Sequence, residues 1–324
     1  MTEEAKIRDT EKEDQDDNGN KGNEEVDDEL KRQTDFVETF EADYKGKKNG
    51  RVIALDFDDV CAQNVLALIT EHNVKFGTDL TLNDYQSYII FQNRGWGPIA
   101  DVERKLKKLG NLLPKTAPIP GFVPALRALH AMGHPLHIVT ARPESDHAAV
   151  IEWLAQQGLT VGMGDDDVIA AAWFTDTYGD LGRPDLGERR STASGVAREQ
   201  ELNEQLKEAL RTKTQQGKGG RNKLKVLRAI NASLFIDDHH GNLEPILESD
   251  PAIPCLLFGP YAWNRSRSGV STPAELMTFQ ERQVHGIPLP REPIHVGDNL
   301  WRAETWEDVI KWVRRWDELD VVGI

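Results

Sequence analysis

The stretch RVIALDFDDVCAQN, residues 51–64, decides the fold, because an apolar run ends there in three carboxylates within four positions. Residues 52–55 are continuously aliphatic, which is typical of a central parallel strand covered on both faces. Asp56, Asp58 and Asp59 follow at the carboxyl end of that strand, where like charges repel and burial is costly. The stretch therefore predicts a buried strand with an acidic site at its end.

Helical and strand-like patterns alternate along the rest of the chain. Further strands are predicted in PLHIVTAR (135–142), VIAAAWFT (168–175), SLFIDD (233–238) and IPCLLFG (253–259), and helices at 118–134, 146–158, 222–232 and 305–316. The alternation predicts an α/β fold with a doubly wound parallel sheet. Thr140 follows Asp56 by about 80 residues, more than one crossover needs. We therefore expect a small helical cap at about 62–118, inserted after the first catalytic strand.

Two segments differ in composition from the rest of the chain, one before the expected folded domain at 49–324 and one within it. Residues 1–44 hold 17 Asp and Glu against 6 Lys and Arg, so −11 of the net charge of −15 lies there. Such a segment buries too little apolar surface to offset the entropy of ordering it, and we predict a disordered acidic tail at 1–48. Residues 179–221 are polar and glycine-rich at both ends, which favours a mobile insertion loop.

Composition argues against several classes of protein. The sequence has no run of about 18 apolar residues, and its beginning does not resemble a secretory signal, so we expect no membrane association. It has only two cysteines, Cys61 and Cys255, which fits a reducing, cytoplasmic location. Beyond the tail the chain has no basic excess, which argues against a nucleic-acid polymer as partner but not against a nucleotide.

Polar residues recur at the ends of three predicted strands. They are Asp56 with Asp58, Thr140 with Arg142, and Asp237 with Asp238. Ligands of open α/β sheets bind beyond the carboxyl ends of the strands, so these side chains are expected to meet in one crevice. Carboxylate ligands without nearby His or Cys spacing favour Mg²⁺, which binds through one or two carboxylates and the phosphate of a substrate.

Four short motifs resemble those of haloacid dehalogenase (HAD) superfamily phosphatases, in the same order. DFDDV, IVTAR and NKLKVLRAINASLFIDD carry them, and PYAWNR and LWRAETWEDVI look like the end of the 5′-nucleotidase and 5′(3′)-deoxyribonucleotidase branch. The resemblance implies a Mg²⁺-dependent phosphomonoesterase that forms an aspartyl-phosphate on a small phosphorylated metabolite, with a nucleoside monophosphate as the expected substrate.

The same resemblance assigns roles to individual residues. It implies Asp56 as nucleophile, Asp58 as general acid and base, Lys223 as the steadying cation, Thr140, Ala141 and Arg142 as phosphate contacts, and Asp56, Asp58, Asp237 and Asp238 as metal ligands. Lys225 is an alternative to Lys223, since a helix turns residues two apart by about 200° and only one can face the site. Asp237 and Asp238 compete for the direct metal contact.

Other residues keep two interpretations at this point. Asp59 is expected to cap a helix or to be solvated, and His239 and His240 are expected in a loop. The aromatic cap residues either stack on a nucleobase or form the cap's own core; they are Tyr85, Tyr88, Phe91 and Trp96. The alternatives for the whole chain are a phosphatase for a non-nucleotide metabolite, or a weakly catalytic HAD-fold protein whose tail binds unknown protein partners.

Overall fold

The computed structural model describes residues 50–162, 164, 166–176, 200, 203–205, 207–208 and 218–322. The predicted tail at 1–48, and most of the predicted loop at 179–221, lie outside the described residues. The described residues form a six-stranded sheet in the order β3-β2-β1-β4-β5-β6, with every neighbouring pair parallel. The strands are β1 (Val52–Leu55), β2 (Leu136–Thr140), β3 (Ala171–Phe174), β4 (Ala232–Asp237), β5 (Cys255–Phe258) and β6 (Leu300–Ala303).

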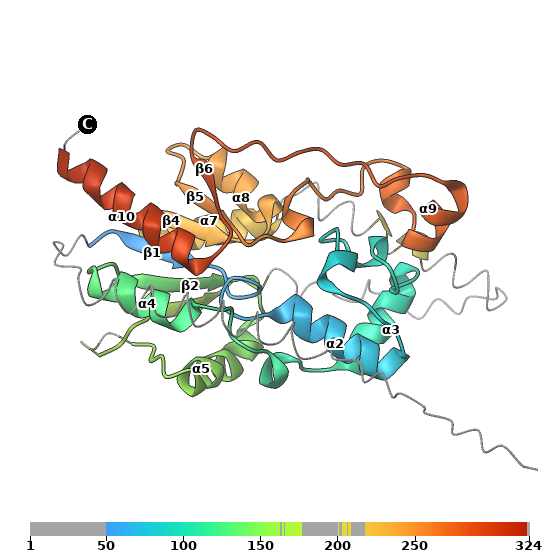
Figure 1. Ribbon diagram of the computed structural model, residues 1–324, viewed down its shortest axis with the longest axis horizontal. Coiled ribbons are helices and arrows are strands. Elements are labelled where there is room, and N and C mark those ends of the chain that lie inside the picture. The colour runs from blue at the N-terminus through green and yellow to red at the C-terminus, as the bar shows by residue number, and fades with distance from the viewer. Residues whose placement is uncertain are drawn as a thin grey trace, which may run out of the picture.

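Helices cover both faces of the sheet, so the predicted doubly wound α/β fold is confirmed (Figure 1). Side chains alternate along a strand, and in β1 this sends Ile53 and Leu55 to one face and Ala54 to the other. The first face packs against α4 (Phe122–Ala131), α5 (His147–Gln156) and α10 (Trp306–Val322). The second packs against α7 (Lys218–Ala229) and α8 (His240–Leu247).

The sequence patterns locate most of these elements. In α10 the predicted apolar face is buried, with Trp306, Ile310 and Val313 all at most 1% exposed. Gly158 follows α5 at a φ of 72°, the left-handed conformation that favours glycine after a helix. The edge strand β6 was not predicted, because LWRA is short and two of its four side chains are only half-buried.

A helical insertion lies beyond the end of β1, as expected, and contains α2 (Asn64–Phe76) and α3 (Ile99–Leu109) (Figure 1). Between these helices the chain forms two short 3₁₀ turns, at Leu82–Asp84 and Ile90–Gln92. The core of the insertion also includes Trp263 and Val270, which follow β5 in the sequence. The insertion is therefore built from two distant parts of the chain.

The second part of this unit is the segment 261–291, which includes α9 (Phe279–His285). The Gln92 side-chain amide donates to the carbonyls of Gly269, at 2.8 Å, and Glu275, at 2.6 Å. These contacts anchor the residues after β5 on the insertion. No helix among the described residues has the length and apolar character needed to cross a bilayer.

A buried histidine makes the stability of the insertion depend on pH. The ring of His72 packs against Trp96 and Phe76, with its Nδ1 2.8 Å from the Thr78 hydroxyl. Burial disfavours the charged imidazolium, and nearby Lys105 adds to this, so the pKa of His72 falls to about 4. In the unfolded chain the pKa returns to about 6.5.

We expect the free energy of unfolding to fall as the pH drops from 6.5 to 4. In that range the unfolded chain binds a proton at His72 that the folded chain does not, which stabilises the unfolded state by up to about 3 kcal/mol. Urea unfolding at pH 7.5 and 4.5 measures the loss, and His72→Phe should reduce it. An identical loss in both proteins would show that His72 does not contribute.

Candidate active site

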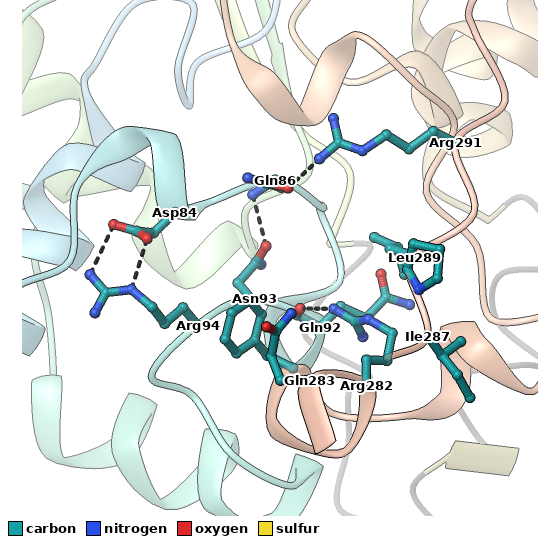
Figure 2. Close-up of a pocket in the computed structure, with 12 residues that line it drawn as sticks. Asp84, Gln86, Gln92, Asn93, Arg94, Arg282, Gln283, Ile287, Leu289 and Arg291 are labelled. Carbon is teal, nitrogen blue, oxygen red and sulfur yellow. Dashed lines mark hydrogen bonds and ion pairs between the residues drawn. The ribbon is translucent and has the colours of Figure 1, made fainter. Parts of the chain in front are cut away.

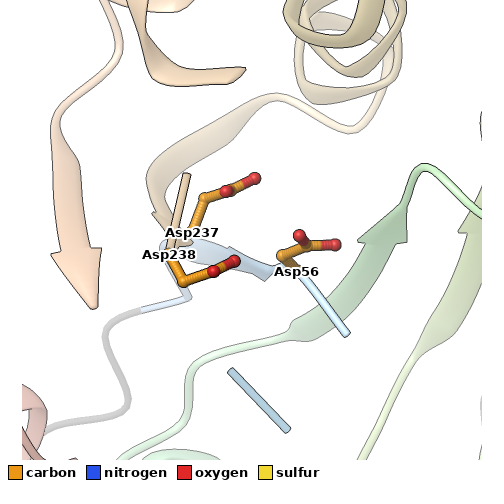
Figure 3. Close-up of side chains that lie close together, drawn as sticks. All are labelled: Asp56, Asp237 and Asp238. Atoms are coloured by element: carbon orange, nitrogen blue, oxygen red, sulfur yellow. The ribbon is translucent and has the colours of Figure 1, made fainter. Parts of the chain in front are cut away.

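Three carboxylates meet where β1 and β4 end. These strands are parallel neighbours that pair Leu55 with Ile236, and the amide of Asp56 donates to the Ile236 carbonyl at 2.8 Å. Asp56 directly follows β1, Asp237 closes β4, and Asp238 comes next. One oxygen of each carboxylate lies within 4.8 Å of one oxygen of the other two, and all three residues are buried (Figure 3). These three residues therefore meet where the two strands end, and we call them the acidic cluster.

Lys223 of α7 supplies a buried positive charge to the cluster. Its Nζ lies 2.9 Å from Asp56 Oδ2 and 2.6 Å from Asp237 Oδ2, and its side chain is fully buried. Burial alone disfavours an ammonium, but the two carboxylates outweigh it and raise the pKa of Lys223 above its ordinary value. Lys225 is exposed on the same helix, so the structure brings Lys223, and not Lys225, to the cluster.

Asp56 and Asp237 are held by further hydrogen bonds. Asp56 Oδ1 accepts from the amide of Phe57 at 2.8 Å, and Asp237 Oδ1 accepts from the amide of His239 at 2.8 Å. The Asn242 amide nitrogen lies 3.1 and 3.2 Å from the two Asp237 oxygens. Burial raises the pKa of Asp56 to about 7, although Lys223 opposes the change. A cation bound beside Asp56 would lower that pKa again.

Asp238 carries the evidence that the cluster fits a metal ion. Its Oδ2 accepts a hydrogen bond from the Trp263 indole at 2.7 Å, while its Oδ1 is buried and has no hydrogen-bond partner among the described residues. Burial raises the pKa of Asp238 well above its ordinary value, as expected for a carboxylate with too few donors. A buried unsatisfied oxygen next to two further carboxylates fits a hard divalent cation, which takes oxygen ligands.

Asp58 lies apart from the acidic cluster and forms an ion pair. The Arg142 guanidinium binds the Asp58 carboxylate in a bidentate manner, with Nη2 2.7 Å from Oδ1 and Nε 3.0 Å from Oδ2. Arg142 also reaches Asp146, with Nη1 3.1 Å from Oδ2. The group of carboxylates that could share one cation thus contains Asp56, Asp237 and Asp238 but not Asp58, which the sequence had placed among the metal ligands.

The predicted phosphate contacts lie at the end of β2, next to this ion pair. Thr140 is fully buried, and its hydroxyl accepts from the amide of Arg142 at 3.2 Å. Ala141 is 6% exposed. The three residues thus belong to the same carboxyl edge of the sheet as the cluster, but Arg142 is already paired with carboxylates.

Asp59 caps a helix, which was one of its two expected roles. Both of its carboxylate oxygens accept from the amide of Val65, at 3.0 and 3.2 Å, near the beginning of α2. Its backbone has a φ of 56°, and its carbonyl accepts from the Tyr261 hydroxyl at 2.9 Å. Asp59 therefore shapes the connection between β1 and the insertion.

Sequence reasoning missed two contacts of the site. Asn242 was not singled out, although its place in HHGN, soon after the acidic strand end, was a usable signal. The ring of His239 stacks on that of Tyr88, with centroids 3.7 Å apart and planes 10° apart. This stack joins the insertion to the residue after Asp238. His240 is the first residue of α8 rather than a loop residue.

Comparisons with known proteins end at the level of the fold. No family model and no curated protein matches the sequence. Several solved structures resemble the chain. One is a HAD-superfamily hydrolase of subfamily IA from Geobacter sulfurreducens (15% identity, 83% of this chain and 99% of that chain covered, TM-score 0.38). Others are a predicted phosphoglycolate phosphatase from Haemophilus somnus (12%, 83% and 100%, 0.41) and a HAD-family hydrolase from Deinococcus radiodurans with bound phosphate and sodium (12%, 84% and 98%, 0.44). At such low identities and TM-scores, the chemistry of the site must be argued from its own geometry.

Proposed function

We propose that the chain is a Mg²⁺-dependent phosphomonoesterase of the HAD type that works through an aspartyl-phosphate. The observation that carries this proposal is the position of Lys223 Nζ between Asp56 and Asp237, in a cluster whose third carboxylate, Asp238, is close enough to share a cation with them. An anionic nucleophile attacks an anionic phosphate only where positive charge offsets both, and the cluster offers one buried ammonium and an oxygen site for a cation.

In the first step an Asp56 oxygen attacks phosphorus, an oxygen–phosphorus bond forms, and the bond to the leaving alcohol breaks. The alcohol takes a proton from Asp58. In the second step Asp58 accepts a proton from water, whose oxygen attacks phosphorus and releases phosphate and free Asp56. Bound Mg²⁺ supplies positive charge that offsets the phosphoryl oxygens, with Asp56, Asp237 and Asp238 as the residues that would hold it.

The pair between Asp58 and Arg142 places a condition on this mechanism. A carboxylate held by two guanidinium nitrogens is not free to donate a proton to a leaving group. Asp58 must therefore leave Arg142 and take up a proton from the solvent when the substrate binds, so that it can protonate the leaving alcohol. Phosphate is itself a bidentate partner for guanidinium, so the substrate can take the place of Asp58 on Arg142.

We further propose a small-molecule substrate, with a nucleoside monophosphate as the first candidate. The helical insertion beyond the end of β1 supports a small substrate, because such caps exclude water and large ligands. Fewer aromatic side chains are available to stack on a nucleobase than the sequence predicted. Tyr85, Phe91 and Trp96 are at most 5% exposed in the core of the insertion. Of these four aromatic residues, Tyr88 is the one whose ring stacks on His239, the residue after Asp238.

We place this activity in the cytoplasm. Cys61 and Cys255 are both buried free thiols, as expected in a reducing compartment. A nucleic-acid polymer is not proposed as a partner, since the chain has a net charge of −15.

Phosphate release from a panel of phosphate esters tests the proposal, with and without Mg²⁺. The panel contains ribo- and deoxyribonucleoside monophosphates, sugar phosphates and an aryl phosphate. We expect release only with Mg²⁺ and fastest from one of the nucleotides. Equal rates across the panel would contradict a nucleotide as the preferred substrate but would still support phosphatase activity. Release that is barely detectable from every ester would favour the alternative of a weakly catalytic interaction protein.

A further inference from the structure

A second cavity lies within the helical insertion, away from the acidic cluster. It has a volume of about 240 Å³ and lies between residues 84–94 and residues 279–291. Figure 2 shows Arg94 on one side and Arg282 and Arg291 on the other. None of the cluster residues and neither Lys223 nor Arg142 lines it. The cavity is therefore separate from the proposed catalytic site.

The lining of this cavity is positively charged in a strongly acidic protein. Three arginines and one aspartate, Asp84, line it, which gives a formal charge of +2. Arg94 is satisfied by carboxylates, with Nε 2.8 Å from Asp84 Oδ1 and Nη1 2.7 Å from Asp79 Oδ1. Arg291 hydrogen-bonds the neutral side chain of Gln86 and is exposed, so its charge is not neutralised there.

Arg282 is the unusual member of the three. It is 5% exposed, and its guanidinium donates to the backbone carbonyls of Met277, at 2.7 Å, and Gln92, at 2.5 Å. Among the described residues it forms no ion pair with a carboxylate. Burial accordingly lowers the pKa of Arg282, with Glu281 partly opposing the change. A buried cation without a counter-charge is costly, and an anion in the cavity would relieve that cost.

We propose that this cavity binds a small phosphate monoester as a second ligand of the protein. A phosphate monoester carries a charge of about −1.5 to −2 near pH 7, and Arg282 and Arg291, which pair with no carboxylate among the described residues, offer it two positive charges. Guanidinium groups bind phosphate oxygens in a bidentate manner. The rest of the lining suits the organic group of the ester, since Phe279, Ile287 and Leu289 are apolar.

The position of the cavity links it to the acidic cluster through one short segment. Gln86 lines the cavity, and Tyr88, two residues further on, stacks on His239 next to Asp238. A ligand that orders Gln86 and Gln92 would therefore also steady the contact between the insertion and the catalytic edge of the sheet. The binding itself does not depend on the proposed phosphatase activity.

Calorimetric titration of the full chain with phenylphosphonate at pH 8, with a chelator present, tests the proposal. This probe is a phosphate monoester analogue that a phosphatase does not hydrolyse. We expect saturable binding that Arg291→Glu weakens at least tenfold, because the substitution reduces the lining from +2 to zero. Arg127→Glu is the matched control, since Arg127 is exposed on α4 and its replacement changes the net charge equally. It should leave the affinity unchanged.

A second variant keeps the charge of the cavity lining but fills the volume of the cavity. Leu289→Trp fills the cavity and should also abolish binding, whereas Asp56→Asn should not affect it. Absence of saturable binding to the unaltered protein would overturn the proposal, as would equal weakening by Arg291→Glu and Arg127→Glu. Loss of binding in Asp56→Asn would assign the probe to the acidic cluster instead. Tighter binding of benzylmalonate would overturn the assignment to phosphate.

Discussion

Replacing Asp56 with asparagine is expected to reduce phosphate release at least about a thousandfold, which corresponds to about 4 kcal/mol in the activation free energy. An amide is a poor nucleophile and does not form the phosphoenzyme, although it occupies nearly the same volume. The neighbours that hold Asp56 in place, Lys223 and the amide of Phe57, remain in the variant. Steady-state rates with an active ester and Mg²⁺ measure the effect.

The control for this substitution is Asp166→Asn, which removes an exposed carboxylate in the loop before β3. It should retain the activity of the unaltered protein. Acid quenching during turnover should also trap a phosphorylated form of the unaltered protein and none of the Asp56→Asn variant. If Asp56→Asn retains most of its activity, the covalent mechanism is wrong, even if the protein remains a phosphatase.

Replacing Lys223 with methionine is expected to lower the free energy of unfolding by about 3–5 kcal/mol at neutral pH. Methionine fills much of the same space but leaves Asp56 and Asp237 buried without their shared ammonium. The carboxylates can recover part of this loss by binding protons, since protonation removes their repulsion. The difference from the unaltered protein should therefore shrink as the pH is lowered. Urea denaturation at pH 7.5 and 5, with a chelator present, measures both effects.

Lys225→Met is the matched control, because Lys225 is exposed on the same helix. A surface substitution of this kind changes stability by at most about 0.5 kcal/mol. Equal losses from the two substitutions would show that the loss arises from the helix itself rather than from the buried charge. A smaller loss for Lys223→Met when Mg²⁺ replaces the chelator would further support a cation within the cluster.

The sequence predicted those parts of the fold that follow from local patterns. The aliphatic run at 52–55 and the apolar faces of α4 and α10 each carry a periodicity that depends only on neighbouring residues. The parallel strands also made the meeting of Asp56 with Asp237 predictable, since parallel strands end at one edge. Strand β6 is short and half-buried, so its local signal is weak, whereas the helix α3 is amphipathic and was not identified individually despite that pattern.

Side-chain directions beyond the strand ends were less predictable. Asp56 and Asp58 would point the same way in a continued strand, but β1 ends at Leu55 and the next residues turn. Asp59 then adopts a φ of 56°. Asp58 pairs with Arg142, which follows β2 and lies 84 positions after Asp58 in the sequence. No sequence spacing specifies such a pair.

The sequence by itself determined the order of the main helices and of strands β1 to β5, the acidic strand end, and the candidate residues. Only the tertiary structure decided that Lys223 and not Lys225 meets the carboxylates, that Asp58 joins Arg142, and that residues 261–291 complete the insertion. The physical reason is that periodicity is a property of adjacent residues. The choice between charge partners depends instead on burial and on distances between segments far apart in the chain.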